Sequence, residues 1–81
     1  MSNVIDLDDV MISPAAFGAW NEFAKRIAEQ IRLLGVTDPS QVPDEQGRVN
    51  PDGSLTIFIT LPNSEVSMTV PKEHWAYRQK H

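Results

Sequence analysis

Residues 55–70 read LTIFITLPNSEVSMTV and predict a β-hairpin. Residues 55–61 and 65–70 place aliphatic side chains at alternate positions and are rich in β-formers, which is typical of half-buried strands. The register that pairs Ile59 with Val66 puts all the aliphatic side chains of the hairpin on one face. This register also pairs Ile57 with Met68 and Leu55 with Val70.

The connection before this hairpin, residues 36–53, is punctuated by proline and glycine. Asn50-Pro51-Asp52-Gly53 is a strong turn signal, in which Gly53 can take the left-handed position of a bulged hairpin. The segment Gly47-Arg48-Val49 is therefore expected to be a short edge strand, which makes the sheet an antiparallel meander of about three strands.

Residues 13–35 predict one long amphipathic helix. Ser13 is a candidate N-cap, Pro14 suits the first helical position, and Gly35 suits a left-handed C-terminal cap. We expect the helix to lie with its apolar stripe across the aliphatic face of the sheet. The stripe comprises Phe17, Trp20, Ala24, Ile27, Ile31 and Leu34, widened by Phe23 and Ala28.

The two ends of the chain are harder to interpret. Residues 1–12 form an acidic arm whose Val4–Leu7 segment could be an edge strand or a helical turn. Residues 71–81 form a tail with a basic excess that could be a short C-terminal helix or extended chain. These oppositely charged ends are expected to be solvated, and the alternative is that they contact each other.

The predicted fold class is α+β, with a single domain in residues 1–81. With no cysteine, the chain has neither a disulfide framework nor a thiolate zinc site to stabilise it. No apolar run is long enough to span a membrane, and the N-terminus has no secretory signal pattern. We therefore expect a cytoplasmic protein that does not contact membranes.

The residues give no pattern for catalysis, a metal or a cofactor. The only histidines are His74 and the terminal His81, and no nucleophile elbow occurs. Asp6, Asp8 and Asp9 resemble a calcium loop in charge alone, because its required glycine and glutamate are missing. We expect no enzyme activity, no metal site and no cofactor.

Direct nucleic-acid binding is also not expected. The net charge is −4, and the basic residues of the helix alternate with Glu22 and Glu29. Phe58 lies on a strand, as base-stacking aromatics do, but it has hydroxyl-bearing neighbours in place of basic ones.

The remaining surface is best suited to a protein partner. Phe58 faces away from the aliphatic sheet face, and the tail adds aromatic side chains beside an arginine, a combination that interfaces favour. The candidate partner-binding residues are Phe58, Trp75, Tyr77, Arg78, Asp6, Asp8 and Asp9.

Three functions follow as hypotheses. The first is a non-enzymatic protein-interaction module, expected to be a homodimer, that acts as an adaptor, regulator or inhibitor of a larger bacterial or phage assembly. The second is an acidic inhibitor that competes with nucleic acid, which requires the arm carboxylates to cluster with Asp44 and Glu45. The third is a small-molecule-binding domain with a pocket between helix and sheet, lined by Trp20, Phe23 and Met68.

Overall fold

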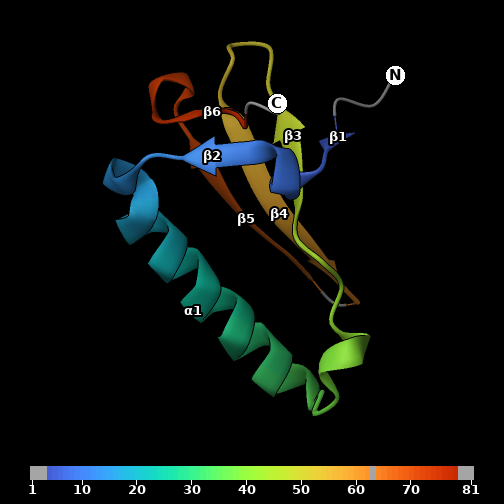
Figure 1. The fold of residues 1–81 in the computed structure, drawn as a ribbon. Helices are drawn as coiled ribbons and strands as arrows, with labels where there is room; N and C mark the ends of the chain where they lie inside the picture. Colours follow the sequence, from blue (N-terminus) through green and yellow to red (C-terminus); the bar gives the residue numbers. More distant parts are fainter. Residues whose placement is uncertain (1–3, 63, 79–81) are drawn as a thin grey trace.

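A computed structural model describes residues 4–62 and 64–78 of the chain (Figure 1). In that part of the chain, one α-helix, α1 (Phe17–Leu34), accompanies six short or medium strands. The strands are β1 (Val4–Ile5), β2 (Val10–Ile12), β3 (Gln46–Val49), β4 (Leu55–Leu61), β5 (Ser64–Val70) and β6 (Trp75–Tyr77). The 3-10 turns are η1 (Leu7–Asp9), η2 (Pro14–Ala16), η3 (Pro39–Gln41) and η4 (Lys72–His74).

The strands form two antiparallel sheets. The larger has four strands in the order β1-β3-β4-β5, and β2 pairs with β6 in a separate two-stranded sheet. Figure 1 shows α1 and β2 on the same side of the larger sheet. The fold is α+β, but the expected sheet of about three strands is too small, because the N-terminal arm adds β1 to the meander β3-β4-β5.

The hairpin has the register that its aliphatic residues require. Ile59 pairs with Val66, and the same ladder joins Ile57 to Met68 and Leu55 to Val70. The ladder continues to Leu61 and Ser64, so only two residues connect the strands. The earlier turn is also as expected, since Gly53 has φ +89° and its N–H donates to the Asn50 carbonyl oxygen at 2.9 Å.

Helix α1 begins later than expected. Pro14 starts the 3-10 turn η2, and the regular helix begins at Phe17. Ser13 gives no side-chain cap, because its hydroxyl donates instead to the His74 carbonyl oxygen at 2.9 Å. The C-terminus matches the prediction: Gly35 has φ +73°, and the Val36 N–H donates back to the Ile31 carbonyl oxygen at 3.3 Å.

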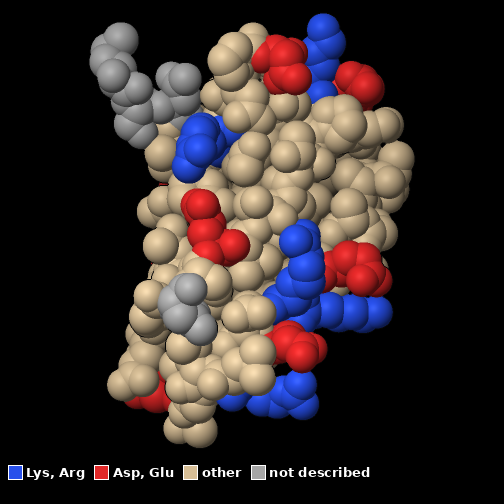
Figure 2. Space-filling view, turned by 180° about the vertical axis from the view of Figure 1, so that it is seen from behind, with Lys and Arg blue, Asp and Glu red and all other residues tan. Residues whose placement is uncertain are grey.

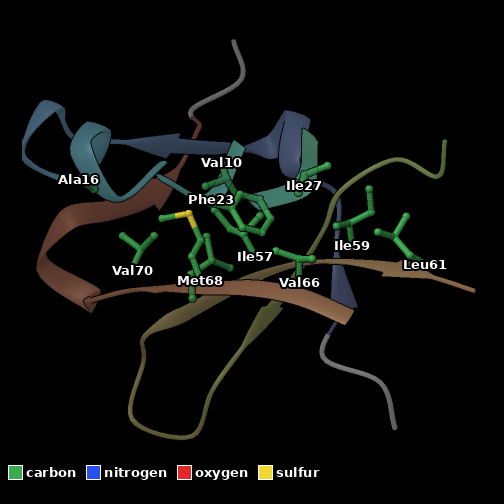
Figure 3. Packing of buried hydrophobic residues seen from close by; sticks show 11 residues of the cluster. Val10, Ala16, Phe23, Ile27, Ile57, Ile59, Leu61, Val66, Met68 and Val70 are labelled. Carbon is green, nitrogen blue, oxygen red and sulfur yellow. The ribbon is translucent and has the colours of Figure 1, made fainter. Parts of the chain in front are cut away.

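The core face of α1 differs from the expected stripe. Phe23 is fully buried and lies centrally among Val10, Ile57 and Met68 (Figure 3). Phe17, which was expected to begin the stripe, is 52% exposed. The helix packs mainly against the edge strand β5, so the sheet covers only part of its wide apolar arc. The side chains packed inward are Ala16, Trp20, Phe23, Ile27, Ile31 and Leu34, and Ala24 and Ala28 are exposed.

The two ends of the chain lie together. The acidic arm forms β1, η1 and β2, and the tail forms the single turn η4 and then β6 in place of a longer helix. The strands β2 and β6 pair directly, and the Arg78 N–H donates to the Asp9 carbonyl oxygen at 2.7 Å. The alternative that the ends contact each other is therefore confirmed for residues 4–78, and the contact is made by backbone hydrogen bonds.

Candidate functional site

An open apolar groove lies between β2 and the first turns of α1. Its volume is about 390 Å³, and its lining consists of Leu7, Val10, Met11, Ile12, Phe17, Trp20 and Arg78. Met11 is 54% exposed and Phe17 is 52% exposed, although both are large apolar side chains. Figure 1 shows how β2 and α1 diverge from η2 and so form the two sides of this apolar groove.

The backbone geometry explains why these two side chains are left uncovered. In β2, Val10 and Ile12 point toward the core, so the intervening Met11 points outward. In α1, Phe17 lies six residues before Phe23, which rotates it about 120° away from the buried face. Trp20 lies between these directions, is half-buried, and has its ring centroid 5.7 Å from that of Phe23.

A second hollow of about 310 Å³ adjoins the apolar groove, and we call it the acidic hollow. It is lined by Asp6, Leu7, Asp8, Trp20, Asp44 and Glu45, so it shares Leu7 and Trp20 with the apolar groove. Asp6 and Asp8 come from the turn η1, where the Asp6 carboxylate accepts a hydrogen bond from the Asp8 N–H at 3.0 Å. Asp44 and Glu45 come from the connection that ends at β3.

Among the described residues, Arg78 is the only cation that lines either hollow. Its backbone is fixed by the Asp9 carbonyl oxygen, and its guanidinium lies 3.4 Å from the Val10 carbonyl oxygen. The two ends of the site therefore carry opposite charge. The Arg78 guanidinium lines the apolar groove, and carboxylates line the acidic hollow on the other side of Trp20.

Only some of the residues that the sequence suggested come together here. Arg78, Asp6 and Asp8 do, whereas Asp9 lines neither hollow. Trp75 is half-buried and donates its Nε1–H to the Gly53 carbonyl oxygen at 2.9 Å. Tyr77 is exposed and packs edge-on against Trp75, with 5.2 Å between ring centroids.

Phe58 offers almost no surface to a partner. It lies on the outer sheet face but is only 6% exposed, and the Arg48 guanidinium lies 4.7 Å from its ring centroid. Figure 2 views the molecule from behind and shows mostly uncharged side chains, with acidic and basic ones interspersed at the top, on the left of the middle and along the lower right margin. That side of the molecule carries no continuous basic stripe among the described residues.

The sequence did not suggest Met11 and Phe17 as site residues, because Phe17 was assigned to the core stripe and Met11 had no role. Trp20 was proposed only as a lining residue of a pocket between helix and sheet. A usable signal was present in α1. Its apolar positions, from Phe17 through Phe23 to Ala28, span an arc wider than one small sheet can cover. The pocket expected between helix and sheet is filled, since Phe23 and Met68 pack in the core.

The structure also brings a serine close to a histidine. The Ser13 Oγ lies 3.4 Å from the His74 Nδ1, but its hydroxyl donates to the His74 carbonyl oxygen at 2.9 Å. The Ser13 N–H donates to the same carbonyl oxygen at 2.8 Å, so this pair ties η4 to the start of η2. Because the hydroxyl proton is given to a peptide oxygen, the arrangement is a structural contact and no nucleophile–base pair.

Other polar features of the described chain are structural. The Ser40 N–H and hydroxyl lower the pKa of the Asp38 carboxyl, and the Ser54 hydroxyl and N–H lower the pKa of the Asp52 carboxyl.

Residues 4–62 and 64–78 contain no group of three or more His, Asp or Glu side chains placed to hold a metal ion. Within the same residues, α1 is too polar to cross a membrane.

Comparison with known proteins adds no relative. No family model matches the sequence, no curated protein shows significant similarity to it, and no solved structure matches its fold.

Proposed function

We propose that this protein is a non-enzymatic interaction module that binds a protein partner through the apolar groove. In this role it acts as an adaptor, regulator or inhibitor of a larger assembly. The observation that carries the proposal is the exposure of Met11 and Phe17 around one hollow, in a chain that buries its other phenylalanines. Exposed apolar surface that gathers in one place is typical of interaction sites.

The groove is large enough to anchor a partner but too small to be a whole interface. Covering the exposed halves of Met11 and Phe17 is worth about 2 kcal/mol, from the usual gain for burying such side chains. Association also has to offset lost translational and rotational freedom. The groove is therefore proposed as the central anchor, with polar contacts around it.

Affinity capture with a matched pair of variants tests the proposal. Phe17→Ser removes the anchor, whereas Leu33→Ser removes a more exposed apolar side chain of α1 that lies outside the groove. A partner captured from native lysate by the wild type should be retained by Leu33→Ser and lost with Phe17→Ser. Identical captured proteins for all three baits would contradict the proposal.

A second candidate function is an acidic inhibitor that competes with nucleic acid. It is favoured by the acidic hollow, which collects four of the five carboxylates that this function requires, Asp6, Asp8, Asp44 and Glu45, but not Asp9. Carboxylates presented in place of phosphates would bind a basic surface. This inhibitor would be displaced by an oligonucleotide and weakened by Asp44→Asn with Glu45→Gln, yet it would be insensitive to Phe17→Ser.

The homodimer expected from the sequence remains a prediction, with a second copy as one alternative occupant of the same groove. Such a dimer would lose its self-association in Phe17→Ser and keep it in Leu33→Ser.

A further inference from the structure

We infer that the apolar groove receives an amphipathic segment of a partner protein whose bulky apolar side chains contact Met11, Phe17 and Trp20. Lys or Arg side chains of that segment lie against the acidic hollow. The inference rests on the proposed function and adds to it the chemistry of the partner and the direction in which it binds.

The two hollows adjoin each other. Leu7 and Trp20 line both of them, so a segment that fills the apolar groove needs to extend only past these two side chains to reach the acidic hollow. Helical segments that bind in grooves present apolar anchors on one face and charged residues beside them. This surface has the complementary arrangement.

The charge of the occupant follows from the lining of the acidic hollow. Four carboxylates line it, and no basic side chain of residues 4–62 and 64–78 does. Among the described residues, the ion pairs are Lys25–Glu22 and Arg32–Glu29, both on the polar face of α1 and neither in the acidic hollow. The carboxylates are thus left for a cationic group of the partner, which gains attraction there and relieves their mutual repulsion.

A second copy of this chain is a poor source of those cations. Of its described basic side chains, Lys25 and Arg32 form the ion pairs on α1, Arg26 donates to the Ser67 carbonyl oxygen at 2.8 Å, and Arg48 lies over Phe58, which leaves Lys72 and Arg78.

Arg78 sets the direction of the segment. It is the one cation that the described part of the chain places at the apolar groove, so it repels Lys or Arg at that end and favours an acidic or carboxyl-terminal group. The basic residues of the partner segment therefore lie on the acidic-hollow side of the apolar anchors.

A displayed library of random peptides, each about 12 residues long or roughly three turns if helical, provides the test. The library is selected on the full folded chain, and each enriched peptide is measured against the wild type, Phe17→Ser, Leu33→Ser and the double variant Asp44→Asn with Glu45→Gln. Circular dichroism first confirms that every variant folds.

We expect enriched peptides to combine large apolar residues with Lys or Arg clustered toward one end. Their dissociation constants should rise about tenfold or more in Phe17→Ser and about fivefold in the double variant, and stay unchanged in Leu33→Ser. Affinity should also fall as salt is raised.

The two levels of the account fail differently. Peptides whose affinity depends on Phe17 but that lack basic residues, or that bind the double variant as tightly as the wild type, would overturn this inference and leave the proposed function standing. Selection without any peptide that depends on Phe17 would overturn the proposed function itself. Self-association of the chain that is lost in Phe17→Ser would replace the partner segment with a second copy.

Discussion

At Gly47 the backbone of β3 passes close to the side chains of Leu7, Ile5 and Leu55, of which Leu7 lines the site. A Cβ at this position would come within 2.9 Å of Leu7 Cδ2, 3.2 Å of Ile5 Cγ1 and 3.3 Å of Leu55 Cδ1. Leu7 lines both hollows, so it is the side chain through which a change in β3 would reach the site.

Gly47→Ala should therefore destabilise the protein by about 1–3 kcal/mol, because overpacking forces neighbouring side chains to shift. Gly18→Ala is the matched control: its Cβ would meet nothing within 4 Å, and it lies in α1. There alanine should stabilise by about 0.5–1 kcal/mol through helix propensity. Urea unfolding midpoints measure both, and equal effects of the two substitutions would contradict the packing described at Gly47.

At Asp52 the carboxylate accepts bonds from the Ser54 hydroxyl at 2.6 Å and from the Ser54 N–H at 2.9 Å. These bonds lower the pKa of Asp52 below its ordinary value of 3.8. A carboxyl whose pKa is lower in the folded state stabilises the fold fully above the ordinary pKa and ceases to do so as the pH falls through the folded pKa.

We therefore expect the free energy of unfolding to fall as the pH drops below about 4, and to fall less steeply in Asp52→Asn. The measurement is urea unfolding of both proteins over a series of acidic pH values. A wild type and a variant with identical pH slopes would show that the turn does not stabilise the charged form.

At the scale of elements, α1 carries two phenylalanines with opposite roles. Phe23 is 0% exposed and sits in the core, whereas Phe17 is 52% exposed on the apolar groove. Phe23→Leu should cost about 1–2 kcal/mol, since it leaves unfilled space in the core. Phe17→Leu should stay within about 0.5 kcal/mol, as exposed positions do. Chemical denaturation of both variants compares them directly, and equal losses would mean that Phe17 is a core residue.

The elements that the sequence predicts are those with local signals. The hairpin repeats its aliphatic residues over two seven-residue strands. Gly35 caps the C-terminus of α1 and Gly53 lies in the turn between β3 and β4, each with a positive φ. The strands β1, β2 and β6 have only two or three residues each, too few for a period to be recognised. They form because segments distant in the sequence pair with each other, as Val10 does with Tyr77.

The candidate site was only partly predictable for the same reason. Asp6, Asp8 and Arg78 could be proposed from charge, whereas Met11, Phe17 and Trp20 required knowing which side of α1 meets the sheet. Ser13 shows a similar effect, because a distant carbonyl oxygen, that of His74, takes the hydroxyl expected to cap the helix.

At the scale of the whole molecule, the net charge disfavours self-association. The chain carries a net charge of −4, so two copies repel each other, most strongly at low ionic strength. If the groove binds a partner segment and not a second copy, sedimentation velocity of the isolated protein should show a single species near the chain mass of 9.1 kDa at every concentration. A concentration-dependent dimer that disappears in Phe17→Ser would instead support the homodimer.

The central claim is that a protein partner binds over Phe17. Photo-crosslinking tests it most directly, with p-benzoylphenylalanine placed at position 17 or, as the control, at the more exposed position 33 of the same helix. On irradiation in native lysate, position 17 should give a discrete adduct with one partner and position 33 should not. No adduct from position 17, or the same adduct from both positions, would contradict the claim.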